Sequence, residues 1–137
     1  MILGIDFGDS RTGFAASDKL EFLASTIENF KEKNMKKVAC RAVELAKEIG
    51  ADKIVLGYPK NMNGTVGDRG KKSKKLAAEI KTLIDIPIIL WDERLTTVSA
   101  HNLMNETNVR GQKRKDSVDK IAAAFILQSY LDSQKNV

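Results

Sequence analysis

Hydrophobic and polar positions follow two different periods along this chain. Short apolar runs bounded by turn residues predict strands at residues 2–7, 12–17, 53–57 and 86–91, and a further strand within residues 22–30. Between them, apolar residues recur at helical spacing from Asn34 to Gly50. Because Asn is favoured at a helix N-cap and Gly just past a helix end, these two residues predict where that helix begins and ends.

Three more helices are predicted in the second half of the chain. A Gly-rich loop at residues 58–70 precedes a helix with apolar residues on one face, and a short helix is expected near Thr96 or Thr97. A polar and basic loop at residues 105–115 leads to a last helix at about residues 116–131. The predicted order is therefore β-β-β-α-β-α-β-α-α.

The lengths of the links between these elements predict an α/β fold. Only four residues separate the first two strands, which is too short for a parallel crossover and indicates an antiparallel hairpin. The later strands are joined through helices, which favours parallel pairing with right-handed connections. We expect a five-stranded mixed sheet with helices on both faces, and a single domain over residues 1–137.

Composition indicates an ordinary globular protein of the cytoplasm. Hydrophobic residues make up 42% and charged residues 30% of the chain. No apolar run is long enough for a transmembrane helix, and the N-terminus lacks the pattern of a signal peptide. Cys40 is the only cysteine in the sequence, which excludes an intrachain disulfide.

The chain carries a net charge of +5, which favours polyanionic partners. Its basic residues gather in three clusters, at residues 31–37, 69–75 and 110–120, so nucleic-acid contact and plain solvated helix faces are both open interpretations. Aromatic residues make up only 6%, which argues against binding by base stacking.

Acidic residues at strand ends and at a helix start are the candidates for catalysis: Asp6, Asp92, Glu93 and Asp119. Each alone could cap a turn or a helix, or be solvated. An isolated carboxylate in a buried strand, such as Asp6, is nevertheless costly unless it is paired or bound to a cation. Converging carboxylates without Cys or His suit Mg²⁺ or Mn²⁺, and two such ions can assist phosphodiester hydrolysis.

The first strand and its turn also resemble the first phosphate loop of the actin, Hsp70 and sugar-kinase ATPases. Those proteins hold the nucleotide between two domains of this type, whereas this sequence provides one. The only histidine, His101, and Cys40 both fall in predicted helices, where packing explains them better than catalysis.

An ordered series of motifs resembles the YqgF (RuvX-like) family of the ribonuclease-H-like superfamily. Its members are described as pre-16S ribosomal RNA nucleases and formerly as Holliday-junction resolvases. The motifs are Gly4 to Gly8 with Arg11 and Gly13, Ser17-Asp18, Val55 to Pro59 with Asn61 to Gly64, Asp92 to Thr97 with Ala100, and Val118 to Ala123.

The resemblance implies a ribonuclease-H-like fold and an acidic triad of Asp6, Glu93 and Asp119 that binds the metal and carries catalysis. It also implies phosphate contacts by the basic residues Arg11, Arg94, Arg114 and Lys115. Two positions depart from the family pattern: Asp9 replaces a small hydroxyl residue, and Tyr58 replaces a leucine.

We therefore expect a metal-dependent nuclease that uses Mg²⁺ or Mn²⁺ and processes the 5′ end of pre-16S ribosomal RNA. A Holliday-junction resolvase, which would need a symmetric dimer to cut two strands, is the nearest alternative. A noncatalytic RNA-binding factor is a third. The expected partner is nucleic acid, with the protein a monomer or weak homodimer and no membrane partner.

Overall fold

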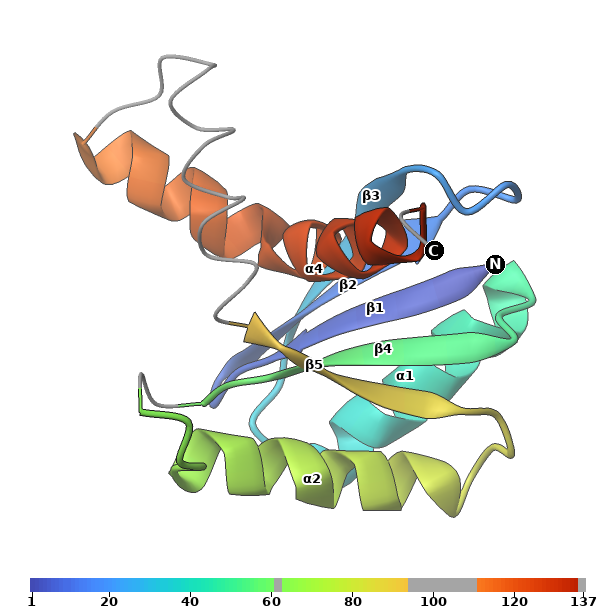
Figure 1. Cartoon of the computed structure of the whole chain (residues 1–137). Helices are drawn as coiled ribbons and strands as arrows, with labels where there is room; N and C mark the ends of the chain where they lie inside the picture. Colours follow the sequence, from blue (N-terminus) through green and yellow to red (C-terminus); the bar gives the residue numbers. More distant parts are fainter. Residues whose placement is uncertain (61–62, 94–110, 136–137) are drawn as a thin grey trace.

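Five strands form one mixed sheet in the order β3-β2-β1-β4-β5 in the computed structural model of the chain (Figure 1). The structure describes residues 1–60, 63–93 and 111–135, the side chains of residues 111–120 excepted. The strands are β1 (Ile2–Phe7), β2 (Arg11–Ser17), β3 (Ala24–Lys31), β4 (Lys53–Tyr58) and β5 (Ile88–Asp92). The helices are α1 (Met35–Ile49), α2 (Asp68–Lys81) and α4 (Gly111–Lys135).

Strand pairing agrees with the link lengths. β1 pairs antiparallel with β2, and β2 pairs antiparallel with β3, with a register shift between Phe14 and Ala15. β1 pairs in parallel with β4, and β4 in parallel with β5. The predicted mixed sheet is confirmed, and β1, the strand that contains Asp6, is its central strand.

The first helix begins and ends where its cap residues predict. The side chain of Asn34 accepts hydrogen bonds from the backbone N–H groups of Lys36 and Lys37, at 3.0 and 3.2 Å. Gly50 adopts the left-handed conformation, with φ of 67°, and its N–H bonds back to the last turn. Local capping chemistry therefore accounts for both ends of α1.

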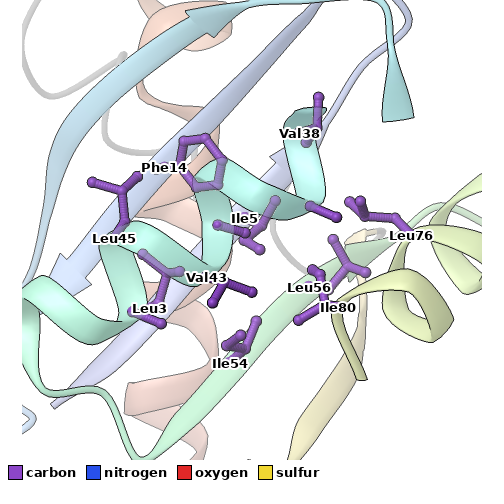
Figure 2. Packing of buried hydrophobic residues seen from close by; sticks show 13 residues of the cluster. Leu3, Ile5, Phe14, Val38, Val43, Leu45, Ile54, Leu56, Leu76 and Ile80 are labelled. Carbon is purple, nitrogen blue, oxygen red and sulfur yellow. The ribbon is translucent and has the colours of Figure 1, made fainter. Parts of the chain in front are cut away.

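Two apolar cores lie on opposite faces of the sheet. Helices α1 and α2 cover one face and α4 covers the other (Figure 1). Figure 2 shows the larger core, in which Leu3 and Ile5 of β1 pack with side chains of α1, α2 and β4. Because side chains alternate along a strand, Gly4 and Asp6 belong to the other face, and Leu127 of α4 lies directly over Gly4.

Three helix boundaries differ from the sequence-based prediction, one of them the end of α4, which lies at Lys135 and not at about residue 131. α2 already begins at Asp68, so Gly70 lies in the helix and not in the loop. A glycine is needed there because a Cβ would lie 2.6 Å from Val66 Cγ1 and 2.8 Å from the Pro59 carbonyl oxygen. α4 begins at Gly111 and not near residue 116, since residues 112–115 (Gln, Lys, Arg, Lys) are good helix formers.

The helix predicted near Thr96 or Thr97 lies outside the described residues. Among the residues that are described, no helix has the length and apolar character needed to cross a membrane.

Candidate active site at the end of the central strands

Asp6 and Glu93 come together on the α4 face of the sheet. Asp6 lies near the end of β1, and Glu93 directly follows β5, with β4 between the two strands. Parallel pairing through β4 brings the carboxyl ends of β1 and β5 to one edge of the sheet. The two side chains share a hydrogen bond, although they are far apart in the sequence.

A hydrogen bond between two carboxyl groups requires a proton on one of them. Burial raises the pKa of Glu93 to about 7, and the negative charge of Asp6 and the hydrogen bond to it act in the same direction. The positive charge of Arg69 opposes this shift without cancelling it. Without a cation, Glu93 therefore stays protonated up to about neutral pH, where the protonated and ionised forms become equally populated.

Gly57 of β4 leaves the room that Glu93 occupies. A Cβ atom at position 57 would collide with the Glu93 carboxylate and would lie 2.7 Å from Ile126 Cδ1 of α4. Glu93 therefore lies across the backbone of β4, between the sheet and α4. The absence of a side chain at Gly57 is what lets it reach Asp6.

Asp6 also lines a pocket of about 270 Å³ that residues of β2 and β3 border. The hairpin after β1 contributes Gly8, Asp9, Ser10 and Arg11, and β3 contributes Asn29. Arg11 is exposed, so its guanidinium is accessible to a ligand in this pocket. Arg11 was predicted from the sequence and Asn29 was not, because only the β2–β3 register, with Gly13 opposite Asn29, brings Asn29 to this place.

Among the residues that the structure describes, the oxygen ligands at this site suit a hard divalent cation. Asp6 and Glu93 supply two carboxyl groups, and a pair that shares a proton can exchange that proton for a cation. Within the described side chains, no group of three acidic, His or Cys residues could hold a metal ion. Asp119 belongs to α4, but its side chain lies outside the described residues.

Asp92, the other acidic residue at the end of β5, is not part of the pair. It pairs in register with Tyr58, on the sheet face opposite Glu93. Its negative charge still contributes to the raised pKa of Glu93. Of the other predicted phosphate contacts, Arg94 and the side chains of Arg114 and Lys115 lie outside the described residues.

A second contact that was not predicted from the sequence joins the β1–β2 hairpin to α2. Lys72 Nζ donates to Asp9 Oδ1 at 3.0 Å. The hydrogen bond and charge of Lys72 lower the pKa of Asp9, and Arg69 in the first turn of α2 adds to this effect and also acts on Glu93. A basic cluster was visible at residues 69–75, but only the fold shows that Lys72 contacts Asp9 and that the charge of Arg69 acts on both Asp9 and Glu93.

Comparison with known proteins assigns the chain to a family. The family described as "RuvX: Holliday junction resolvase" matches residues 1–133. The chain belongs to the RuvX family. A relative from Bacillus subtilis, named "Putative pre-16S rRNA nuclease", is 48% identical over 134 residues, covering 96% of this chain and 97% of its own. One of the same name from Ruminiclostridium cellulolyticum is 48% identical, covering 96% and 93%.

Solved structures share the fold of this RuvX-family chain. Thermus thermophilus RuvC in complex with a Holliday junction substrate superposes with a TM-score of 0.58 and 12% identity, covering 96% of this chain and 94% of that one. The fowlpox virus resolvase with Holliday junction DNA superposes with a TM-score of 0.52 and 14% identity, covering 97% of both chains. The predicted ribonuclease-H-like fold is thereby confirmed.

Proposed function

We propose that this chain is a metal-dependent nuclease that hydrolyses phosphodiester bonds in nucleic acid, with the 5′ end of pre-16S ribosomal RNA as its substrate. The observation that carries the proposal is the Asp6–Glu93 pair, two carboxyl groups held together at the end of the central strands. The name shared by the relatives at 48% identity supports the choice of ribosomal RNA.

Asp6, Glu93 and Asp119 would hold one or two Mg²⁺ or Mn²⁺ ions. Such ions supply an activated water and stabilise the leaving oxygen in phosphodiester hydrolysis. The Asp6–Glu93 pair would release its shared proton on binding a cation. The bound cation would then balance the negative charges of both carboxylates.

The placement of α4 supports Asp119 as the third ligand. Leu127 lies over Gly4, and Ala123 lies over Gly13, the partner of Asp6 in the sheet. Followed toward its N-terminus, α4 therefore advances along β1 toward Asp6. Asp119 precedes Ala123 by four residues, and residues at that spacing share one face of a helix.

The phosphate backbone would be held by cations around the acidic pair. Arg11 lines the pocket that Asp6 shares, and its exposed guanidinium can bind a phosphate oxygen there. Arg94, Arg114 and Lys115 are proposed as further phosphate contacts. The net charge of +5 favours approach of a polyanion toward an otherwise negative site.

A resolvase acting on branched DNA is a second candidate, favoured by the family description and by the fold shared with resolvases. The two candidates share the chemistry and differ in substrate. Cutting both strands of a four-way junction symmetrically would need two copies of the site, whereas trimming an RNA end needs one.

A cleavage assay tests the proposal. Labelled pre-16S RNA, mature-end RNA and a four-way DNA junction are incubated with the protein, with and without Mg²⁺ or Mn²⁺. We expect metal-dependent cleavage of the precursor RNA, loss of cleavage in Glu93→Gln, and retention of it in the exposed control Asp85→Asn. Cleavage of the junction alone would favour the resolvase. Binding of RNA without cleavage under any metal would favour a noncatalytic RNA-binding factor.

A further inference from the structure

The tip of the β1–β2 hairpin is held against α2 by one ion pair in open solvent. Lys72 Nζ lies 3.0 Å from Asp9 Oδ1, with the two side chains 51% and 72% exposed. An ion pair this exposed contributes little to stability. The hairpin also closes without it, because the N–H of Gly8 donates to the carbonyl oxygen of Arg11 at 3.0 Å. Its role in the fold is therefore minor.

The position of the pair is more informative than its strength. Asp9 lines the pocket that contains Asp6 and Arg11. Arg69 precedes Lys72 by three residues, so the two cations share one flank of α2, and both are exposed. The charge of Arg69 acts on Asp9 and on Glu93 alike. Positive charge on α2 therefore lies beside Asp9, through Lys72 and Arg69, and reaches the acidic pair through Arg69.

We propose that Lys72 and Arg69 form a phosphate subsite for the nucleic-acid backbone beside the acidic pair, and that Asp9 occupies this subsite until nucleic acid binds. The inference rests on the proposed function, since it assigns part of the same substrate to α2. A carboxylate offers Lys72 the same kind of charged oxygen acceptor that a phosphate does. A phosphate would replace Asp9 there by exchange of one ion pair for another, with no covalent step.

In this arrangement, the residue at position 9 determines how strongly the protein binds its substrate. While Asp9 holds Lys72, the cation adds nothing to phosphate binding. Displacing Asp9 leaves its carboxylate near the polyanion, which lowers affinity further. Removing the charge of Asp9 should both release Lys72 and relieve that repulsion.

A double-mutant cycle between positions 9 and 72 separates this role from a structural one. A fluorescein-labelled RNA that spans the 5′ end of pre-16S ribosomal RNA is titrated in EDTA at several salt concentrations. Asp9→Asn should tighten binding and steepen the dependence of log K on log salt by about 0.7–0.9 units, the value of one phosphate contact. Lys72→Gln should lower affinity and slope only slightly in the wild-type protein, where a phosphate must first displace Asp9, but should abolish the whole gain in the Asp9→Asn protein.

Two controls match the charge changes. Asp85→Asn removes an exposed carboxylate beyond the far end of α2 and should leave the slope unchanged. Lys71→Gln removes the neighbouring exposed cation of α2, and its effect should be the same in the wild-type protein and in the Asp9→Asn variant.

The alternatives give different results. If the pair only fastens the hairpin, Asp9→Asn and Lys72→Gln will lower the melting temperature equally and leave the slope unchanged, which would overturn the subsite. Equal effects of Lys72→Gln in both backgrounds would also overturn it, because Asp9 would then not compete with phosphate. A wild-type protein that binds neither this RNA nor a four-way DNA junction at low salt would overturn the proposed function as well.

Discussion

The carboxylate of Glu93 occupies the space that a side chain at Gly57 would fill. The relationship ties a glycine in a buried strand to a charged group of the candidate site. The two nearest atoms that a Cβ would meet, Glu93 Oε1 and Ile126 Cδ1, are the ends of flexible side chains. A methyl group at position 57 would therefore be accommodated by moving Glu93 away from Asp6 more than by unfolding the sheet.

We expect Gly57→Ala to reduce metal affinity and cleavage strongly while lowering the free energy of unfolding by only about 1–3 kcal/mol, the usual range for an overpacked core. Calorimetric titration with Mn²⁺ and urea unfolding would measure the two effects. In a Glu93→Gln background, Gly57→Ala should cause no further loss of metal affinity. A Gly57→Ala protein that binds metal as the wild type does would contradict this account of the glycine.

Much of the fold follows from local patterns in the sequence. β1 begins and ends where its apolar run predicts, and α1 ends at its predicted caps, because alternation, helical spacing and capping are properties of neighbouring residues. The mixed pairing followed from the short first link and the later crossovers. α2 was predicted to begin too late because Gly70 was taken for a loop residue. Gly70 lies in the first turn of α2, where it packs closely against Pro59 and Val66.

The candidate site was only partly predictable, because local patterns do not show which elements become neighbours. Asp6 was marked by the cost of a charge in a buried strand, which the sequence shows directly. The Gly57–Glu93 contact and the Lys72–Asp9 pair join residues on separate elements, so they depend on strand order and helix rotation. No periodicity within one element contains that information.

The stability of the metal-free protein should fall as pH rises toward neutrality. The pKa of Glu93 is about 7 in the folded protein against an ordinary value of 4.5. The folded state therefore binds this proton more tightly, so the group's contribution is fully present below pH 4.5 and is lost as pH rises through about 7. Urea unfolding in EDTA from about pH 4.5 to about pH 8 would show the decline, and Glu93→Gln should flatten it. Parallel pH profiles for the two proteins would contradict the shift.

Divalent cations should reverse that loss. Millimolar Mg²⁺ or Mn²⁺ should raise the melting temperature, because the ion binds the folded state preferentially. The increase should be larger at about pH 8 than at about pH 6, since binding must displace the proton that Asp6 and Glu93 share. Scanning calorimetry at both pH values measures it, with Asp85→Asn as a control that should respond like the wild type. A melting temperature indifferent to both ions would count against a shared metal site.

Salt should weaken RNA binding steeply, and the proposed phosphate contacts should account for part of the slope. Each lost contact lowers the slope of log K against log salt by about 0.7–0.9 units. We expect about one such step for Arg11→Gln, which removes the exposed cation of the Asp6 pocket, and up to two for the double variant Arg114→Ala, Lys115→Ala. Fluorescence anisotropy in EDTA measures the slopes. An unchanged slope would remove that residue or stretch from the binding surface.

Asp6→Asn distinguishes two roles that Asp6 could have near the end of the central strand: metal ligand or turn cap. The substitution keeps the shape of the side chain and removes its charge, so metal affinity and cleavage should be lost while the fold persists. Removing the charge of Asp6 should also bring the pKa of Glu93 closer to its ordinary value, because that charge is one cause of the shift. RNA binding in EDTA should stay the same or tighten, since one negative charge beside the phosphates is gone.

If Asp6 only capped its turn, the variant would still cut RNA and would lose about 0.5–2 kcal/mol of stability. Wild-type cleavage by a well-folded Asp6→Asn protein, measured on the precursor RNA with Mg²⁺ or Mn²⁺, would exclude Asp6 from the metal site.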